Sequence, residues 1–212
     1  MMNLIKERFI RVYGQKVWDD FVSFRGSDEE NTTKSIDCFK QHLLDYANRL
    51  KPFDDETTYP RPVKNFYKRN SQFARFVLIS IECVKVNNEN PAKKGELSSN
   101  SFHLEHIVSQ SHCDKNSWKN WIGNLSLISG ELNTCSDYAQ LRTPKEKWDY
   151  ARDKVLPEKE MYINNFLINE IPDNGLSSAI IARGNNLQRD FQAIFSEKGI
   201  DEYLRNVLKY PG

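Results

Sequence analysis

Residues that could do chemistry are concentrated in one stretch of this chain of 212 residues, from Phe102 to Asn133. Three of the four histidines and two of the four tryptophans fall within it. Its run "LEHI" puts an acid and an imidazole next to each other, as Glu105 and His106. Adjacent side chains on a β-strand point to opposite faces, so this pair could approach a bound phosphate from two directions.

A carboxylate and an imidazole are the groups that hydrolysis of a phosphodiester requires. A divalent cation neutralises charge on the scissile phosphate and the leaving oxygen, and a neutral imidazole takes a proton from the attacking water. Carboxylate and amide oxygens select hard cations. Asn133 is an oxygen partner for Glu105 later in the same stretch. We therefore expect Mg²⁺ (or Mn²⁺) as the cofactor.

The pattern of the stretch predicts the elements that hold these side chains. "SFHLEHIV" alternates apolar and polar residues and predicts a short strand, and "GNLSLIS" predicts a second one. The intervening "HCDKNSWKNW" is a predicted loop, and "GELNTCSDYA" begins a predicted helix. The order strand, loop, strand, helix would bring Asn133 to Glu105.

The run "LEHIVSQ…W…IGNLSLISGELN" resembles the HNH, or His-Me finger (ββα-metal), nuclease motif. More narrowly, it resembles the C-terminal nuclease domain of GmrSD-type, modification-dependent restriction enzymes. The resemblance implies that His106 is the general base and that Glu105 and Asn133 bind the metal. It also implies that Asn124 steadies the loop over the site. The proline of the family's run is Ser109 in this chain, where a proline would shape a turn without taking part in the chemistry.

The same resemblance, which covers roughly residues 66 to 195, implies an activity and partners. The activity is a divalent-metal-dependent DNA endonuclease, a nickase because one such site cuts one strand, in defence against phage or other foreign DNA. The partners are DNA and an NTPase or modification-sensing domain or subunit, in cis or in trans. The chain itself carries no Walker-type glycine loop.

Helical periodicity dominates the rest of the chain. Apolar residues recur at steps of three and four over residues 4–24, 33–50 and 64–86, and again after Pro144 and around Ile180. The predicted fold class is mainly α with a small β-hairpin, a ββα-metal motif embedded in a helical domain. The predicted division is a helical N-terminal region 1–90, a linker 91–100, and a region 101–212 with the nuclease motif at about 102–140 and a helical C-terminal cover.

Basic residues on the 64–86 helix form a candidate surface for the phosphate backbone. All but Arg69 lie opposite a predicted apolar stripe. The alternative interpretation is that these side chains form an ordinary solvated surface. Further basic candidates lie in the C-terminal half. The predicted contacts with nucleic acid are Lys64, Lys68, Arg69, Arg75, Lys145 and Arg183, with Lys147 as a further candidate.

Composition bounds the class of protein. Hydrophobic residues make up 39% and charged residues 28%, which is typical of a globular chain, and the net charge of +1 requires any phosphate-facing surface to be local. The four cysteines show no paired spacing, which predicts a reduced, cytoplasmic protein. No secretory signal and no membrane-spanning run is visible, so no membrane partner is expected.

Three alternatives remain open at this level. A zinc site of mixed Cys/His type could use residues between Phe102 and Asn133 together with Cys135, although no CxxC or HxxxH pair anchors it. The candidates are His103, His106, His112, Cys113 and Cys135. A nucleic-acid-binding module could keep the ββα shape without activity. An RNase of the same fold is the third alternative, because such sites recognise phosphate geometry more than bases.

Overall fold

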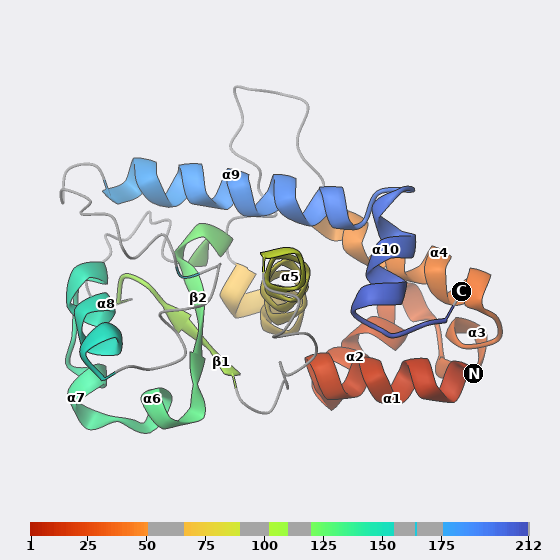
Figure 1. Ribbon diagram of the computed structural model, residues 1–212, viewed down its shortest axis with the longest axis horizontal. Coiled ribbons are helices and arrows are strands. Elements are labelled where there is room, and N and C mark those ends of the chain that lie inside the picture. The colour runs from red at the N-terminus through yellow and green to blue at the C-terminus, as the bar shows by residue number, and fades with distance from the viewer. Residues whose placement is uncertain (51–65, 90–101, 110–119, 155–163, 165–175, 212) are drawn as a thin grey trace.

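The computed structural model describes residues 1–50, 66–89, 102–109, 120–154, 164 and 176–211, and of residues 66–70 and 86–89 it describes the backbone alone. Helices dominate, with a two-stranded antiparallel hairpin between them, which confirms the predicted fold class (Figure 1). The elements are α1 (Met2–Tyr13), α2 (Gln15–Val22), α3 (Glu29–Thr32), α4 (Ile36–Ala47), α5 (Phe66–Glu89), β1 (Phe102–His106), β2 (Leu125–Ser129), α6 (Gly130–Thr134), α7 (Ser136–Ala139), α8 (Pro144–Asp153), α9 (Leu176–Ile194) and α10 (Gly199–Asn206), with 3₁₀ turns η1 (Phe24–Gly26), η2 (Asn48–Leu50) and η8 (Ile122–Asn124).

The N-terminal helix is broken where the sequence predicted a continuous one. Gly14 has φ +92° and ψ 158°, a backbone conformation that residues with a Cβ rarely adopt, and it separates α1 from α2. The break lets both helices turn apolar faces to one core, in which Phe9 and Phe21 lie with ring centroids 5.0 Å apart. The prediction of one helix over 4–24 was therefore wrong.

Side-chain caps fix several helix starts. The Ser35 hydroxyl accepts from the backbone N–H of Cys38 at 3.1 Å and begins α4. Asp28 does the same for Asn31 at 2.8 Å and begins the short α3, which lies between the predicted helical ranges 4–24 and 33–50.

Helix α5 lies at the centre of the molecule. Every residue from Phe76 to Cys83 is buried, so the predicted division into one apolar and one basic face was too simple for this part of the helix. Neighbours cover the helix from several sides: α1 and α2, then α9 and α10, then β2 and η8. In Figure 1 it is seen nearly end-on, between the hairpin and the N-terminal helices.

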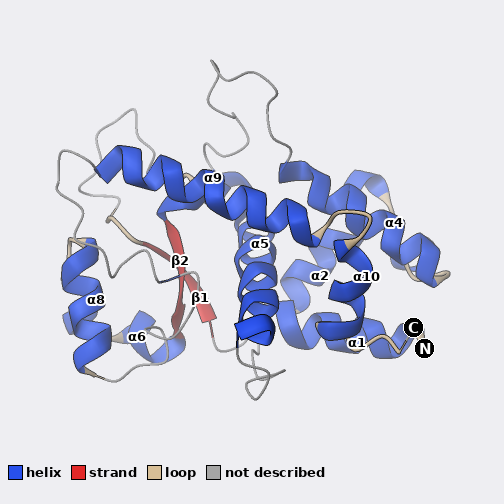
Figure 2. Cartoon of the chain, turned by 45° about the horizontal axis from the view of Figure 1, so that its top comes forward, coloured by secondary structure: helices blue, strands red, loops and turns tan. Residues whose placement is uncertain are grey.

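Helix α9 is 19 residues long and links the hairpin side of the molecule to α10 (Figure 1). Both views show it crossing from the side of the hairpin and α8 to the side of α10 (Figures 1 and 2). It packs on η8, on α5 and on α10. One hydrophobic cluster accordingly joins Phe9 and Phe76 to Ile122, Leu125 and Leu127. The predicted linker 91–100 lies outside the described residues, and the predicted division at this point stays a prediction.

A buried hydroxyl network ties the two ends of the chain together. The Tyr13 hydroxyl lies 2.6 Å from that of Tyr203 and 3.0 Å from Ser80 Oγ, so it links α1, α5 and α10. Burial raises the pKa of both tyrosines well above the usual range, so they stay neutral hydrogen-bonding groups. Among the described residues, no helix is both long and apolar enough to cross a bilayer.

Candidate active site

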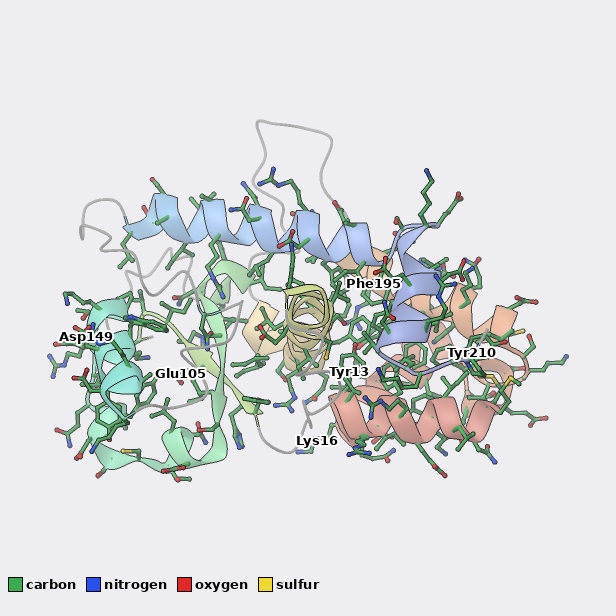
Figure 3. All side chains as sticks on the ribbon, viewed as in Figure 1. Tyr13, Lys16, Glu105, Asp149, Phe195 and Tyr210 are labelled. Atoms are coloured by element: carbon green, nitrogen blue, oxygen red, sulfur yellow. The ribbon has the colours of Figure 1, made fainter. Side chains whose placement is uncertain are left out.

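The hairpin presents Glu105 and His106 as the last two residues of β1. In the antiparallel register Glu105 pairs with Ser126, and His106 pairs with Leu125. The two side chains therefore leave opposite faces of the hairpin. The residue His106 is 8% exposed, whereas the Glu105 side chain is 26% exposed. Figure 3 shows Glu105 on the part of the molecule near α8, away from Tyr13 and Phe195 in the helical core.

Asn124 fixes the backbone immediately after β1. It is fully buried, its Oδ1 accepts from the N–H of Val108 at 2.9 Å, and its Nδ2 donates to the Val108 carbonyl at 3.2 Å. Its own carbonyl accepts from the N–H of Ile107 at 2.9 Å. One asparagine thus satisfies both backbone groups of Val108. Its predicted part in steadying the loop over an active site stays a prediction.

The turn that carries Asn124 is pressed against α9. A Cβ on Gly123 would lie 2.0 Å from the Ile180 carbonyl oxygen and 2.9 Å from the Gly184 nitrogen, so glycine alone fits. The Nη1 of Arg183 donates to the carbonyls of Gly123 at 2.7 Å and Leu125 at 2.8 Å. Helix α9 therefore sets the position of η8, and through Asn124 it sets the end of β1.

The burial of Arg183 corrects its predicted role. The residue is 6% exposed, and burial lowers the pKa of its guanidinium to about 9, which leaves it charged at neutral pH. A guanidinium enclosed by backbone carbonyls does not also lie on a phosphate, so the predicted DNA contact does not hold. Its hydrogen bonds instead satisfy backbone carbonyls at the end of the η8 turn.

Glu105 has a buried partner that the sequence analysis did not assign to it. The Lys147 Nζ lies 2.5 Å from Glu105 Oε1 and 2.5 Å from the carbonyl oxygen of His106. The Lys147 side chain is 4% exposed and lies over the ring of Tyr138, 5.5 Å from its centroid. A signal was present, because Lys147 and Ala151 are one turn apart on the inner face of α8.

Asn133 lies on the short helix that follows β2. Ser129 begins α6 by accepting from the N–H of Leu132 at 3.2 Å, and α6 contacts both strands. Asn133 is exposed. The predicted single helix over "GELNTCSDYA" is instead two short ones, because Cys135 is extended with ψ 119° and separates α6 from α7.

His103 is exposed and shares a hairpin face with Glu105. Its Nε2 lies 3.6 Å from the position that a Cβ on Gly130 would take. It therefore lies against the first residue of α6.

The donor set fits a hard cation. Glu105 and Asn133 both offer oxygen, neither is buried, and Mg²⁺ is commonly held by one or two carboxylates together with waters and substrate phosphates. Within the described part of the chain, no group of three or more His, Cys, Asp or Glu side chains could hold a metal ion. His112 and Cys113 of the zinc alternative lie outside the described residues.

The other basic candidates differ in what the structure says of them. Lys64 lies outside the described residues, and of Lys68 and Arg69 only the helical backbone is described. Arg75 is half-buried, and its Nη1 donates to the Phe102 carbonyl at 2.6 Å, so it ties α5 to the start of β1 rather than standing on an open basic face. The Lys145 side chain is 61% exposed and lies 2.8 Å from Asp149.

Comparison with known proteins gives one family. The family model described as GmrSD restriction endonucleases, C-terminal domain, matches residues 61–190. These residues include α5, the hairpin with η8 and α6, α8, and most of α9. No curated protein and no solved structure matches the chain.

Proposed function

Because the chain belongs to the family of the C-terminal domain of GmrSD restriction endonucleases, we propose that it is a divalent-metal-dependent DNA endonuclease of the HNH type. The observation that carries the proposal is the fixed end of β1. Glu105 and His106 are adjacent in β1 there, and their side chains leave opposite faces of the hairpin. Asn124 holds the backbone of the next two residues, Ile107 and Val108.

In this proposal His106 takes the proton from the attacking water. The neutral form of the imidazole carries a lone pair on one ring nitrogen, which is the group that accepts the proton of the water. Its place at the end of a strand, with buried Ile107 and Val108 behind it, restricts the backbone that carries the ring. The role of Asn124 is to keep that backbone in place.

Glu105 and Asn133 would hold Mg²⁺ or Mn²⁺. When bound, the cation would neutralise charge on the scissile phosphate and the leaving oxygen. The support is the chemistry of the donors, a carboxylate and an amide oxygen on adjoining elements, β1 and α6. A single site of this kind would cut one strand per event, so the proposed product is a nick.

The exposed lysine of α8 and the start of α5 are the proposed path of the DNA backbone. Lys145 is exposed beside the elements that carry Glu105. Its ion pair with Asp149 lies at the surface, so a DNA phosphate can take the place of the Asp149 carboxylate at little cost. Lys64, Lys68 and Arg69 stay in the proposal on their sequence pattern alone. Arg75 and Arg183 are left out of it.

The biological role follows the family. We propose that the chain acts in restriction of phage or other foreign DNA and works with an NTPase or modification-sensing domain, in cis or in trans. The support is the family alone.

Metal dependence and the class of nucleic acid can be tested together. Purified chain is incubated with supercoiled plasmid or with a structured RNA, in Mg²⁺, Mn²⁺ or EDTA. The expected result is conversion of supercoiled to open-circular DNA with either metal and none in EDTA. Metal-dependent cleavage of RNA alone would replace DNA with RNA as the substrate, and cleavage that persists in EDTA would overturn the metal site.

A further inference from the structure

The buried ammonium of Lys147 joins the two residues of the proposed active site. Its Nζ donates to the side chain of Glu105 and to the main chain of His106, each at 2.5 Å. The ion pair is largely enclosed, with side-chain exposures of 4% for Lys147 and 26% for Glu105. By contrast, the ion pair of Lys145 with Asp149 on the same helix lies at the surface, where the Lys145 side chain is 61% exposed and that of Asp149 is 30% exposed.

The start of α8 holds this lysine rigidly. Thr143 and Glu146 form a capping box, in which the backbone N–H of Glu146 donates to Thr143 Oγ1 at 3.2 Å and the N–H of Thr143 donates to Glu146 Oε2 at 2.9 Å. Pro144 occupies the first turn. The Lys147 N–H then donates to the Thr143 carbonyl at 3.2 Å, so the lysine stands one turn inside a well-anchored helix.

We infer that Lys147 is a positioning residue of the nuclease site. It fixes the orientation of the Glu105 carboxylate through Oε1, which leaves Oε2 for a cation, and it holds the backbone that carries His106. The inference rests on the proposed function. Because its side chain is enclosed, Lys147 does not reach a phosphate, and the DNA contact considered for it from sequence is replaced by this role.

The two contacts of Lys147 distinguish this role from a general contribution to stability. An ion pair that only stabilises the fold needs no more than one carboxylate within reach of the ammonium, at any position in the protein. Here the second acceptor is the carbonyl of the very next residue, so one ammonium constrains both the proposed metal ligand and the proposed base. Residues that orient metal ligands in this way commonly affect activity by about 10- to 100-fold when they are removed.

The test compares Lys147→Met with Lys154→Met. Lys154 follows the last residue of the same helix and is exposed, so the control removes the same charge from the surface. We expect Lys147→Met to lower kcat for plasmid nicking by about 10- to 100-fold with KM within about twofold of wild type, because the substrate contacts are untouched. Lys154→Met should match wild type in both constants.

A second readout needs no bound metal. Thermal unfolding in EDTA is measured for wild type, Lys147→Met, Glu105→Gln and the double variant. Lys147→Met should lower the Tm clearly in the wild-type background and much less with Glu105→Gln, because the two charges are coupled. If Lys147→Met does not fold, Lys147→Gln, which removes the charge but keeps a polar side chain, takes its place in both measurements.

The outcomes separate the two proposals. If wild type cleaves and Lys147→Met cleaves like Lys154→Met, the positioning role is wrong and the nuclease stands. An equal Tm loss in both backgrounds, or a rise in KM that accounts for the whole loss of activity, would also overturn it. A wild-type chain that cleaves neither DNA nor RNA with any metal would overturn the proposed function, and the positioning role in cleavage with it.

Discussion

At the scale of single residues, the site depends on polar side chains that satisfy backbone groups. Asn124 and Arg183 are both buried, and both bond to main-chain atoms of the hairpin or its turn. Buried polar groups of this kind are costly when a partner is removed, since the group left behind has lost its water as well. Asn124 is therefore expected to matter to folding as well as to cleavage.

Replacing Asn124 by Ala should destabilise the protein measurably. The change leaves the N–H and the carbonyl of Val108 without their side-chain partner. At about 1–3 kcal/mol for each of the two unsatisfied groups, we expect a loss of about 2–6 kcal/mol in the free energy of unfolding, measured by urea denaturation. Asn186→Ala, on the exposed side of α9, is the control, with an expected change below about 0.5 kcal/mol. Equal stability of Asn124→Ala and wild type would show that the loop does not depend on this residue.

The residues of the site could be predicted to different degrees. The neighbours Glu105 and His106 and the spacing to Asn124 and Asn133 are local in the sequence, so a motif can find them. The pairing of Glu105 with Lys147 spans 42 positions and depends on how α8 packs against the hairpin. No local pattern contains that information, although a lysine on the inner face of a helix is a hint.

At the scale of elements, the contact between η8 and α9 controls the site. Backbone meets backbone there, because Gly123 and Gly184 face each other without side chains. Helix α9 and η8 can therefore approach each other more closely than they could if a side chain stood at position 123. The two glycines differ in how much space surrounds them, which allows a matched comparison.

Gly123→Ala should destabilise the protein, whereas Gly184→Ala should not. A Cβ on Gly123 would lie 2.0 Å from a carbonyl oxygen, which requires the turn or α9 to move. We expect a loss of about 1–3 kcal/mol and reduced cleavage. A Cβ on Gly184 would meet its nearest atom at 3.5 Å, an ordinary contact, and alanine favours a helix interior by about 0.5–1 kcal/mol, so this variant should be neutral or more stable.

Urea denaturation of the two variants checks this prediction. If Gly123→Ala were as stable as Gly184→Ala, the turn and the helix would not be in backbone contact, and the role of α9 in placing the site would be wrong.

Elements were predicted well where their signals are local. The helices with clear three-and-four periodicity and the two alternating strands were found, and Ser35 and Thr143 mark two helix starts in the sequence. The break at Gly14 depends on a positive φ that the periodicity of apolar residues does not reveal. Helix α5 was misjudged for a related reason, since a central helix surrounded by several elements shows no single apolar stripe.

At the scale of the whole molecule, one hydrophobic cluster includes the N-terminal helices and the nuclease hairpin. It contains Phe9 from α1, Phe76 from α5, Leu127 from β2 and Phe191 from α9. Shared burial of this kind couples the unfolding of the parts that share it. The N-terminal helices, which lie outside the residues 61–190 that the family model matches, are thus part of the support of the site.

Hydrogen exchange can test whether the molecule unfolds as one unit. With increasing urea below the transition, the best-protected amides of α1, α5 and β2 should converge on the same opening free energy, because they share a core. Mass spectrometry of peptides from these elements measures this. Amides of β2 that exchange through a smaller, urea-independent opening while α1 and α5 stay protected would instead favour two separate units.

The most direct test of the account is the effect of His106→Ala on nicking of supercoiled plasmid by the purified chain in Mg²⁺ or Mn²⁺. Loss of a general base should lower the rate by about 10²- to 10⁴-fold in a variant that folds normally and still binds DNA. His103→Ala, three residues earlier in the same strand, should cleave at close to the wild-type rate. If His106→Ala cleaves as fast as wild type, the proposed active site is not at the end of β1.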